Sequence, residues 1–178
     1  MCIENKAFFS LTKKQVTSFS NLLFTLLMKS NIKIQLHQKC TEIINQQILD
    51  LKNILQEAQN AANNETKSSA GDKHETGRAM AQLETEKLSN QLSQALKTKE
   101  TISRINPGTI LQVVALGSLV STNNGVFFIA VGLGKIEMNN VDYFVISPLS
   151  PIGKELMGLK EKDAFSFNRK NYVVERIE

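Results

Sequence analysis

The sequence predicts an α+β protein in which an antiparallel helical coiled-coil hairpin precedes a small antiparallel β domain with one short helix. Two long stretches with helical periodicity flank a short polar segment, which indicates two helices folded back on each other. After Pro107 the composition changes from Gln and Lys to Val, Ile, Phe and Gly, as is typical of strands and tight turns. We therefore divide the chain into an N-terminal extension (residues 1–27), a hairpin (28–106) and a C-terminal domain (107–178).

Composition and charge exclude some functions. The 178 residues are 42% apolar and carry a formal net charge of +4. Residues 28–106 have eleven basic and nine acidic side chains, and residues 107–178 have seven of each. Binding to free duplex nucleic acid needs clustered Lys and Arg, which neither region contains. Only Cys2 and Cys40 are present, which favours a reducing compartment, here the cytoplasm, without a disulfide framework or zinc site.

The first 27 residues differ from the rest and hold four of the nine Phe residues. Their apolar run, Phe19–Met28, is shorter than the roughly 20 residues that span a bilayer, so we expect no membrane association. A signal peptide with Lys13 and Lys14 as its basic region is one alternative, but no small-residue cleavage site follows. A short N-terminal helix is another. We favour a chain that begins at Met28, with residues 1–27 as a non-structural extension.

The first predicted helix covers residues 31–62. Its seam residues alternate spacings of four and three, an a/d pattern with a period of 3.5 that is typical of coiled coils. The seam consists of Ile34, His37, Thr41, Ile44, Ile48, Leu51, Leu55, Ala58 and Ala62.

The second predicted helix covers residues 74–105 and ends at the stop signal Asn106-Pro107-Gly108. Each helix would be about 45–50 Å long at 1.5 Å per residue. A parallel homodimeric coiled coil is the alternative, but Gly71 and its Asn and Ser neighbours favour a turn, so we expect a monomeric hairpin. The second seam consists of Leu88, Leu92, Ala95, Lys99 and Ile102, widened by Met80, Leu83 and Leu96.

The C-terminal domain is predicted to be a small sheet. Asn124-Gly125 between apolar runs indicates a hairpin turn. Ser150 is suited to be the N-cap of a short helix that starts at Pro151 and continues to Met157, with Gly158 at its end. The expected strands are Thr109–Leu116, Ser118–Ser121, Val126–Val131, Val141–Ser147, Ala164–Phe167 and Tyr172–Ile177.

The polar segment between the two helices contains the only G-D-x-x-E of the chain, at Gly71, Asp72 and Glu75. Asp followed three residues later by Glu at a helix start is a capping box. The same spacing places two carboxylates on one helix face, and carboxylates that leave room for water suit Mg²⁺. Because the two carboxylates would be exposed, we expect them to form only half of a metal site, which another macromolecule would complete. We interpret His37, in the first seam, as a packed residue rather than a ligand.

Two motifs and the predicted architecture together resemble one protein family. The tip G-D-K-H-E (71–75) is similar to G-D-[LI]-S-E. The segment I-S-P-L-S-P-I-G-K-E-L-M-G-L-K-E-K-D (146–163) is similar to I-S-x-x-S-P-[IM]-A-x-A-L-[IL]-x-K-x-x-G-D. Over about residues 28–178 the chain thus resembles the Gre transcript-cleavage factors of bacterial RNA polymerase, in which a coiled-coil hairpin precedes an FKBP-like domain.

The resemblance implies a cofactor of another enzyme rather than an enzyme. The FKBP-like domain would dock on bacterial RNA polymerase through Ser150 and Pro151, and the hairpin would enter the secondary channel. There Asp72 and Glu75 would share an Mg²⁺ with the polymerase and stimulate cleavage of backtracked RNA at its 3′ end. The expected RNA or polymerase contacts at the tip, for which a solvated charged surface is the alternative, are Lys67, Lys73, His74 and Arg78.

Two departures from the family pattern keep other functions open. Thr76-Gly77-Arg78-Ala79 replaces the family's N-A-E-Y after the tip, so an aromatic residue is lost. Leu149 replaces the Asn or Asp that precedes Ser-Pro in the family. The first alternative is a regulator that occupies the polymerase channel without cleavage activity. A more distant one is a coiled-coil adaptor unrelated to polymerase.

Overall fold

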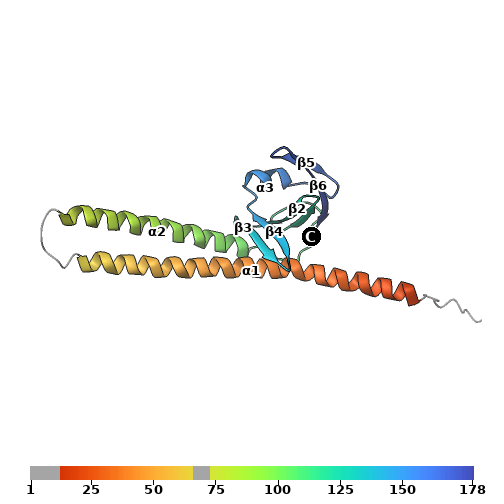
Figure 1. The fold of residues 1–178 in the computed structure, drawn as a ribbon, viewed down its shortest axis with the longest axis horizontal. Coiled ribbons are helices and arrows are strands. Elements are labelled where there is room, and N and C mark those ends of the chain that lie inside the picture. The colour runs from red at the N-terminus through yellow and green to blue at the C-terminus, as the bar shows by residue number, and fades with distance from the viewer. Residues whose placement is uncertain (1–12, 66–72) are drawn as a thin grey trace, which may run out of the picture.

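The protein is a helical hairpin with a β domain against its base (Figure 1). This computed structural model describes residues 13–65 and 73–178, with side chains described for 32–60 and from Ala79 onward. Helices α1 (Lys13–Glu65) and α2 (Lys73–Ser103) form the hairpin. A six-stranded sheet and one short helix, α3 (Pro151–Leu156), follow. The predicted α+β class is therefore confirmed.

Helix α1 begins earlier than predicted. It extends without a break from Lys13 through Met28, whereas the sequence pattern predicted a start near residue 31. The sequence has no Gly or Pro between Cys2 and Ala70, so nothing in it interrupts helix propagation. Helix α2 lies alongside only the C-terminal part of α1 (Figure 1). Whether residues 1–27 are dispensable stays a prediction.

The predicted seam packs the two helices together. Ile44 and Ile48 of α1 are buried, as are Leu88, Ala95 and Ile102 of α2. The widening of the second stripe was wrong, because Met80 (66% exposed), Leu83 (62%) and Leu96 face solvent. Two helices present only one face each to their partner, so a wider stripe has nothing to pack against.

At the base of the hairpin α1 uses a second face. Ile34 was expected in the seam but is exposed, whereas Leu36 and Cys40 are completely buried. Both belong to the core that joins the hairpin to the sheet. The two-helix pattern did not predict this second packing partner.

The sheet is mixed rather than wholly antiparallel as predicted. Its order is β3-β4-β2-β1-β6-β5, and β2 pairs with β4 in parallel. The chain leaves β2, runs back along the outer edge as β3, and returns as β4 between them, so β4 has the direction of β2. The strands are β1 (Leu119–Thr122), β2 (Gly125–Ile129), β3 (Gly134–Met138), β4 (Val141–Ile146), β5 (Ala164–Phe167) and β6 (Lys170–Ile177).

One predicted strand is absent from the described residues, and one strand of the sheet was not predicted. Thr109–Leu116 is a connector, in which the Val114 N–H donates to the Leu159 carbonyl at 2.9 Å and the Val114 carbonyl accepts from Gly158 at 2.9 Å. These bonds tie it to the loop after α3 instead of the sheet. Strand β3 was missed. It pairs with β4 through a turn in which Asn139 and Asn140 have φ of 54° and 60°, the left-handed geometry of a two-residue hairpin loop.

The sheet separates two apolar cores because alternate residues of a strand face opposite sides. Phe128 of β2 and Val145 of β4 belong to the core shared with Leu36 of the hairpin. Phe127 and its neighbour Ile129 belong to the core shared with α3. The resulting layers are hairpin, sheet and α3, with the hairpin base fixed on one sheet face.

Candidate functional site

The N-terminal end of α2, which contains Glu75 of the acidic motif, belongs to the free end of the hairpin. The C-terminal end of α1 and the N-terminal end of α2 lie away from the β domain (Figure 1). Asp72 and Lys67 lie outside the described residues, so their predicted roles stay predictions. Backbone alone is described for the other predicted tip residues, all of which fall in the first two turns of α2: Lys73, His74, Glu75 and Arg78.

The part of the chain that the structure describes offers no metal site of its own. No group of three or more His, Cys, Asp or Glu side chains within it could hold an ion. His37 Nε2 lies 2.9 Å from the Ile102 carbonyl oxygen and donates to this acceptor in the last turn of α2. His37 therefore joins the two helices, in agreement with its interpretation as a packed residue.

Ser150 starts α3 as predicted. Its backbone is extended (φ −66°, ψ 154°), its Oγ accepts from the Gly153 N–H at 3.1 Å, and Pro151 follows as the first helical residue. The same Oγ donates to the Ser147 carbonyl at 2.7 Å. Both bonds fix the helix start, so the hydroxyl of Ser150 is used within the fold, whereas Pro151 is exposed.

This loop is unusually tight at Gly153. A Cβ at that position would lie 2.1 Å from the Ser147 carbonyl oxygen and 2.8 Å from Ser150 Oγ. The similar family motif has Ala there, whereas the loop geometry of this chain has room only for Gly. The N-cap at Ser150 could be predicted from the sequence, whereas the close approach of Gly153 to the Ser147 carbonyl could not.

The most exposed large apolar side chain near α3 is Leu149, at 80%. Its backbone N–H donates to Ser147 Oγ at 3.2 Å, so the loop that presents it is held from within. Leu149 and Pro151 thus flank the half-buried cap residue Ser150 and form an apolar projection. Of the predicted docking pair, Pro151 is available to a partner and Ser150 supports the loop.

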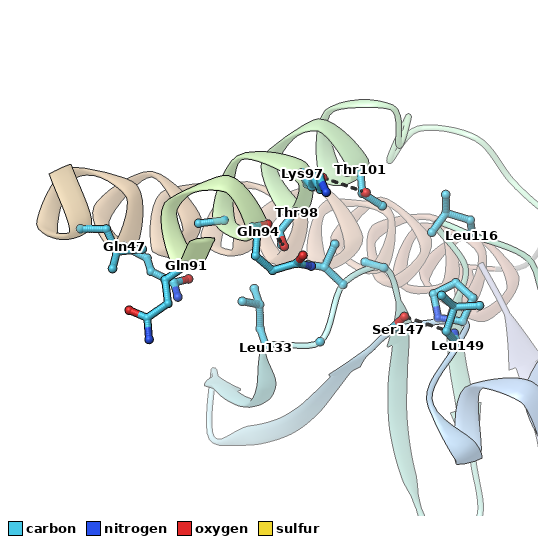
Figure 2. Close-up of a pocket in the computed structure, with 16 residues that line it drawn as sticks. Gln47, Gln91, Gln94, Lys97, Thr98, Thr101, Leu116, Leu133, Ser147 and Leu149 are labelled. Carbon is cyan, nitrogen blue, oxygen red and sulfur yellow. Dashed lines mark hydrogen bonds between the residues drawn. The ribbon is translucent and has the colours of Figure 1, made fainter. Parts of the chain in front are cut away.

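A groove lies between this loop and the hairpin, with a volume of about 860 Å³ (Figure 2). Its hairpin wall is polar, with Gln47, Gln94 and Lys97. Its β-domain wall is apolar, with Leu133 and Leu149. The groove has no signal in the sequence because its walls come from separate segments, in α1 (residues 47–51), α2 (91–101) and the β domain (116–149).

The free polar groups of the groove are amides and one ammonium. The Thr98 hydroxyl donates to the Gln94 carbonyl at 2.9 Å, and the Thr101 hydroxyl donates to the Lys97 carbonyl at 3.0 Å (Figure 2). Both hydroxyls are thus used within α2. The residues that line the groove include no carboxylate, imidazole or thiol.

Comparisons with known proteins add the following. No family model and no curated protein matches the chain. A solved structure titled "Structure of the transcription factor Gfh1" is similar, with 21% identity, a TM-score of 0.32, and coverage of 78% of this chain and 92% of that one. Similarity at this level carries no functional argument. Among the described residues, none of the helices is long and apolar enough to cross a membrane.

Proposed function

We propose that this protein is a transcription factor of the Gre type that binds bacterial RNA polymerase. The β domain docks on the rim of the secondary channel, and the hairpin enters the channel with its free end first. The observation that carries the proposal is the division of the molecule into a projecting hairpin and, at its base, the exposed Leu149–Pro151 loop. The sequence resemblance assigns the polymerase-docking role to this loop and the catalytic role to the acidic motif between the two helices.

The tip would act on a site that belongs to the polymerase. Asp72 and Glu75 supply oxygen donors, which are the ligands that Mg²⁺ accepts, and two carboxylates leave coordination positions for water and for polymerase groups. An Mg²⁺ held jointly would stabilise the attacking and leaving oxygens during hydrolysis of the RNA. The residues of this chain orient that site and hold the backtracked RNA 3′ end through Lys67, Lys73, His74 and Arg78.

The cleavage proposal is tested by removing both charges at the tip. Asn and Gln retain the capping geometry, so Asp72→Asn/Glu75→Gln should fold and bind polymerase, yet fail to accelerate cleavage in a stalled elongation complex. The matched control is Glu84→Gln/Glu86→Gln, which removes two exposed charges of the same helix farther from the tip. This control variant should stimulate RNA cleavage by the polymerase as strongly as the wild type does at every Mg²⁺ concentration.

A second candidate is a regulator that occupies the channel without stimulating cleavage. The loss of the family's aromatic residue, at whose position Ala79 stands in Thr76-Gly77-Arg78-Ala79, favours it. In that case the wild type binds polymerase and competes for the channel, but neither the wild type nor the double variant accelerates cleavage. Equal acceleration by both proteins would instead leave the carboxylates only a capping role.

Docking is tested separately with Leu149→Ala and Pro151→Ala. The side chain of Leu149 is exposed and does not belong to the core. Its truncation should therefore weaken polymerase binding and leave the melting temperature unchanged. Val141→Ala is the control, because Val141 is a partly exposed apolar residue beside the β3–β4 turn. Normal binding by a folded Leu149→Ala/Pro151→Ala variant would show that the docking surface lies elsewhere.

A further inference from the structure

Lys33 is a charged residue in an apolar place. It lies in α1 at the base of the hairpin and is only 3% exposed. Leu36 and Cys40, three and seven residues on along the same side of the helix, are completely buried in the core shared with the sheet. Lysine is rarely buried this far unless its ammonium has partners.

The partners of Lys33 come from two other parts of the chain. Its Nζ donates to the Thr109 carbonyl at 2.7 Å, across 76 residues of sequence. Thr109 lies in the connector that leads from α2 to the β domain. Burial lowers the pKa of Lys33, and the negative charge of Glu178, which follows β6 and pairs with Arg176 at 3.1 Å, raises it by less. The cluster thus joins α1, the connector and the end of the sheet.

The apolar core around this cluster does not define one orientation by itself. Hydrophobic burial is non-directional, and the side chains on the two sides of the joint, such as Ile44 and Phe128, make apolar contacts without directional bonds. A hydrogen bond to a carbonyl is directional. If α1 turned or slid on the sheet, the ammonium would stay buried and lose its acceptor, which is strongly unfavourable.

We infer that Lys33 is a positioning residue, whose hydrogen bond to the Thr109 carbonyl selects one angle between the hairpin and the β domain. The ammonium is not there to increase stability, because removing a charge from water opposes folding. Its effect is to exclude other orientations of the hairpin. This inference is independent of what the hairpin binds.

The angle can be measured with two spin labels and pulsed electron resonance. Gln56→Cys on α1 and Lys154→Cys on α3 are exposed labelling sites, introduced into a Cys2→Ser background. Cys40 stays unlabelled because it is completely buried and burial raises the pKa of its thiol to about 12. Lys33→Met should broaden the distance distribution roughly twofold or more as other orientations become populated, with an unchanged or higher melting temperature.

Lys39→Met is the matched control, since Lys39 is an exposed lysine of the same helix, paired only with Glu42. It should leave the distribution and the melting temperature unchanged. Glu178→Gln provides a second variant that keeps Lys33 but removes the negative charge that acts on it and that pairs with Arg176, and it should broaden the distribution less than Lys33→Met. An unchanged width in Lys33→Met overturns the inference. A lower melting temperature in Lys33→Met overturns it as well, since Lys33 would then be a simple stabiliser.

Discussion

The base and the distal arm of the hairpin are built from the same two helices but are stabilised differently. At the base, α1 packs on α2 with one face and on the sheet with another, and Leu36, Cys40 and Ile44 are completely buried. In the arm, residues 51–60 of α1 and 79–92 of α2 meet along one seam. There Leu88 is the only buried hydrophobic residue described, and Leu51, Leu55 and Leu92 remain partly exposed.

The difference shows that packing on a third layer buries the base of the hairpin more completely than pairing of two helices alone. Two-helix pairing buries one stripe, and helical stability in proteins comes mainly from such packing. The arm should therefore open locally at lower free energy than the base. A projecting element of this kind keeps its length through helical continuity, while its position is fixed at the base.

The largest effect is expected from Phe128→Ala. Phe128 is completely buried in the core between the sheet and the hairpin base, and truncating such a residue costs about 3–5 kcal/mol. Urea unfolding should show this loss, with α1 and α2 at the base losing protection from hydrogen exchange together with the sheet. If the hairpin base stayed protected while the sheet unfolded, the shared core would not act as one unit.

Gly153→Ala should have a smaller and local effect. Its Cβ would meet the Ser147 carbonyl, so the loop must shift, at about 1–3 kcal/mol for overpacking. We expect faster hydrogen exchange in α3 and its loop, with no change in the arm. Gly132→Ala is the control, because a Cβ there meets nothing within 4 Å. Equal unfolding curves for the two variants would contradict the close approach at Gly153.

Local patterns allowed the sequence to predict part of this fold. The 3.5-residue period identified the seam through Ile44 and Ile48, and the Ser150-Pro151 pair identified the start of α3, because each signal lies within a few residues. The same logic overpredicted a strand at Thr109–Leu116, a connector in which Val114 is buried whereas Ile110 is exposed. It also missed β3, an edge strand in which only Ile136 is buried.

The candidate functional residues also divide into those that a local sequence pattern predicts and those that only contacts between distant segments define. The acidic motif at Asp72 and Glu75 is a local pattern and could be recognised from sequence, although its geometry lies outside the described side chains. The groove and the Lys33 cluster depend on contacts between distant segments, for example Lys33 with Thr109. No periodicity or spacing encodes such a contact, so only the structure could reveal it.

Leu55→Ala tests whether the arm of the hairpin contributes less to stability than the base. Leu55 lies in the seam but is only partly buried, so its truncation should cost about 1 kcal/mol, much less than a fully buried residue. Hydrogen exchange should accelerate in the arm and remain unchanged in the sheet. Leu83→Ala, an exposed residue of the same arm, should stay within about 0.5 kcal/mol of the wild type. A loss from Leu55→Ala as large as that from Phe128→Ala would remove the distinction between arm and base.

The smallest expected effect is a pH dependence at the joint. Burial lowers the pKa of Lys33, and the attraction of Glu178 offsets only part of this shift. Between the lowered value and the ordinary lysine pKa of about 10.4, the unfolded chain binds more protons than the folded protein, so stability rises with pH.

The Lys33→Met variant carries no charge at this position, so its stability relative to the wild type should be highest near neutral pH. The difference in stability between the variant and the wild type should shrink as the pH rises from the lowered pKa of Lys33 to the ordinary lysine pKa. Tyr143, whose pKa is raised by burial and then by Glu178, titrates in both proteins and cancels in the difference. Urea unfolding from about pH 8 to about pH 10.5 measures it, and Lys39→Met should follow the wild type throughout. A difference that grew with pH would mean that the folded protein favours the charged form of Lys33 and that the ammonium stabilises the joint.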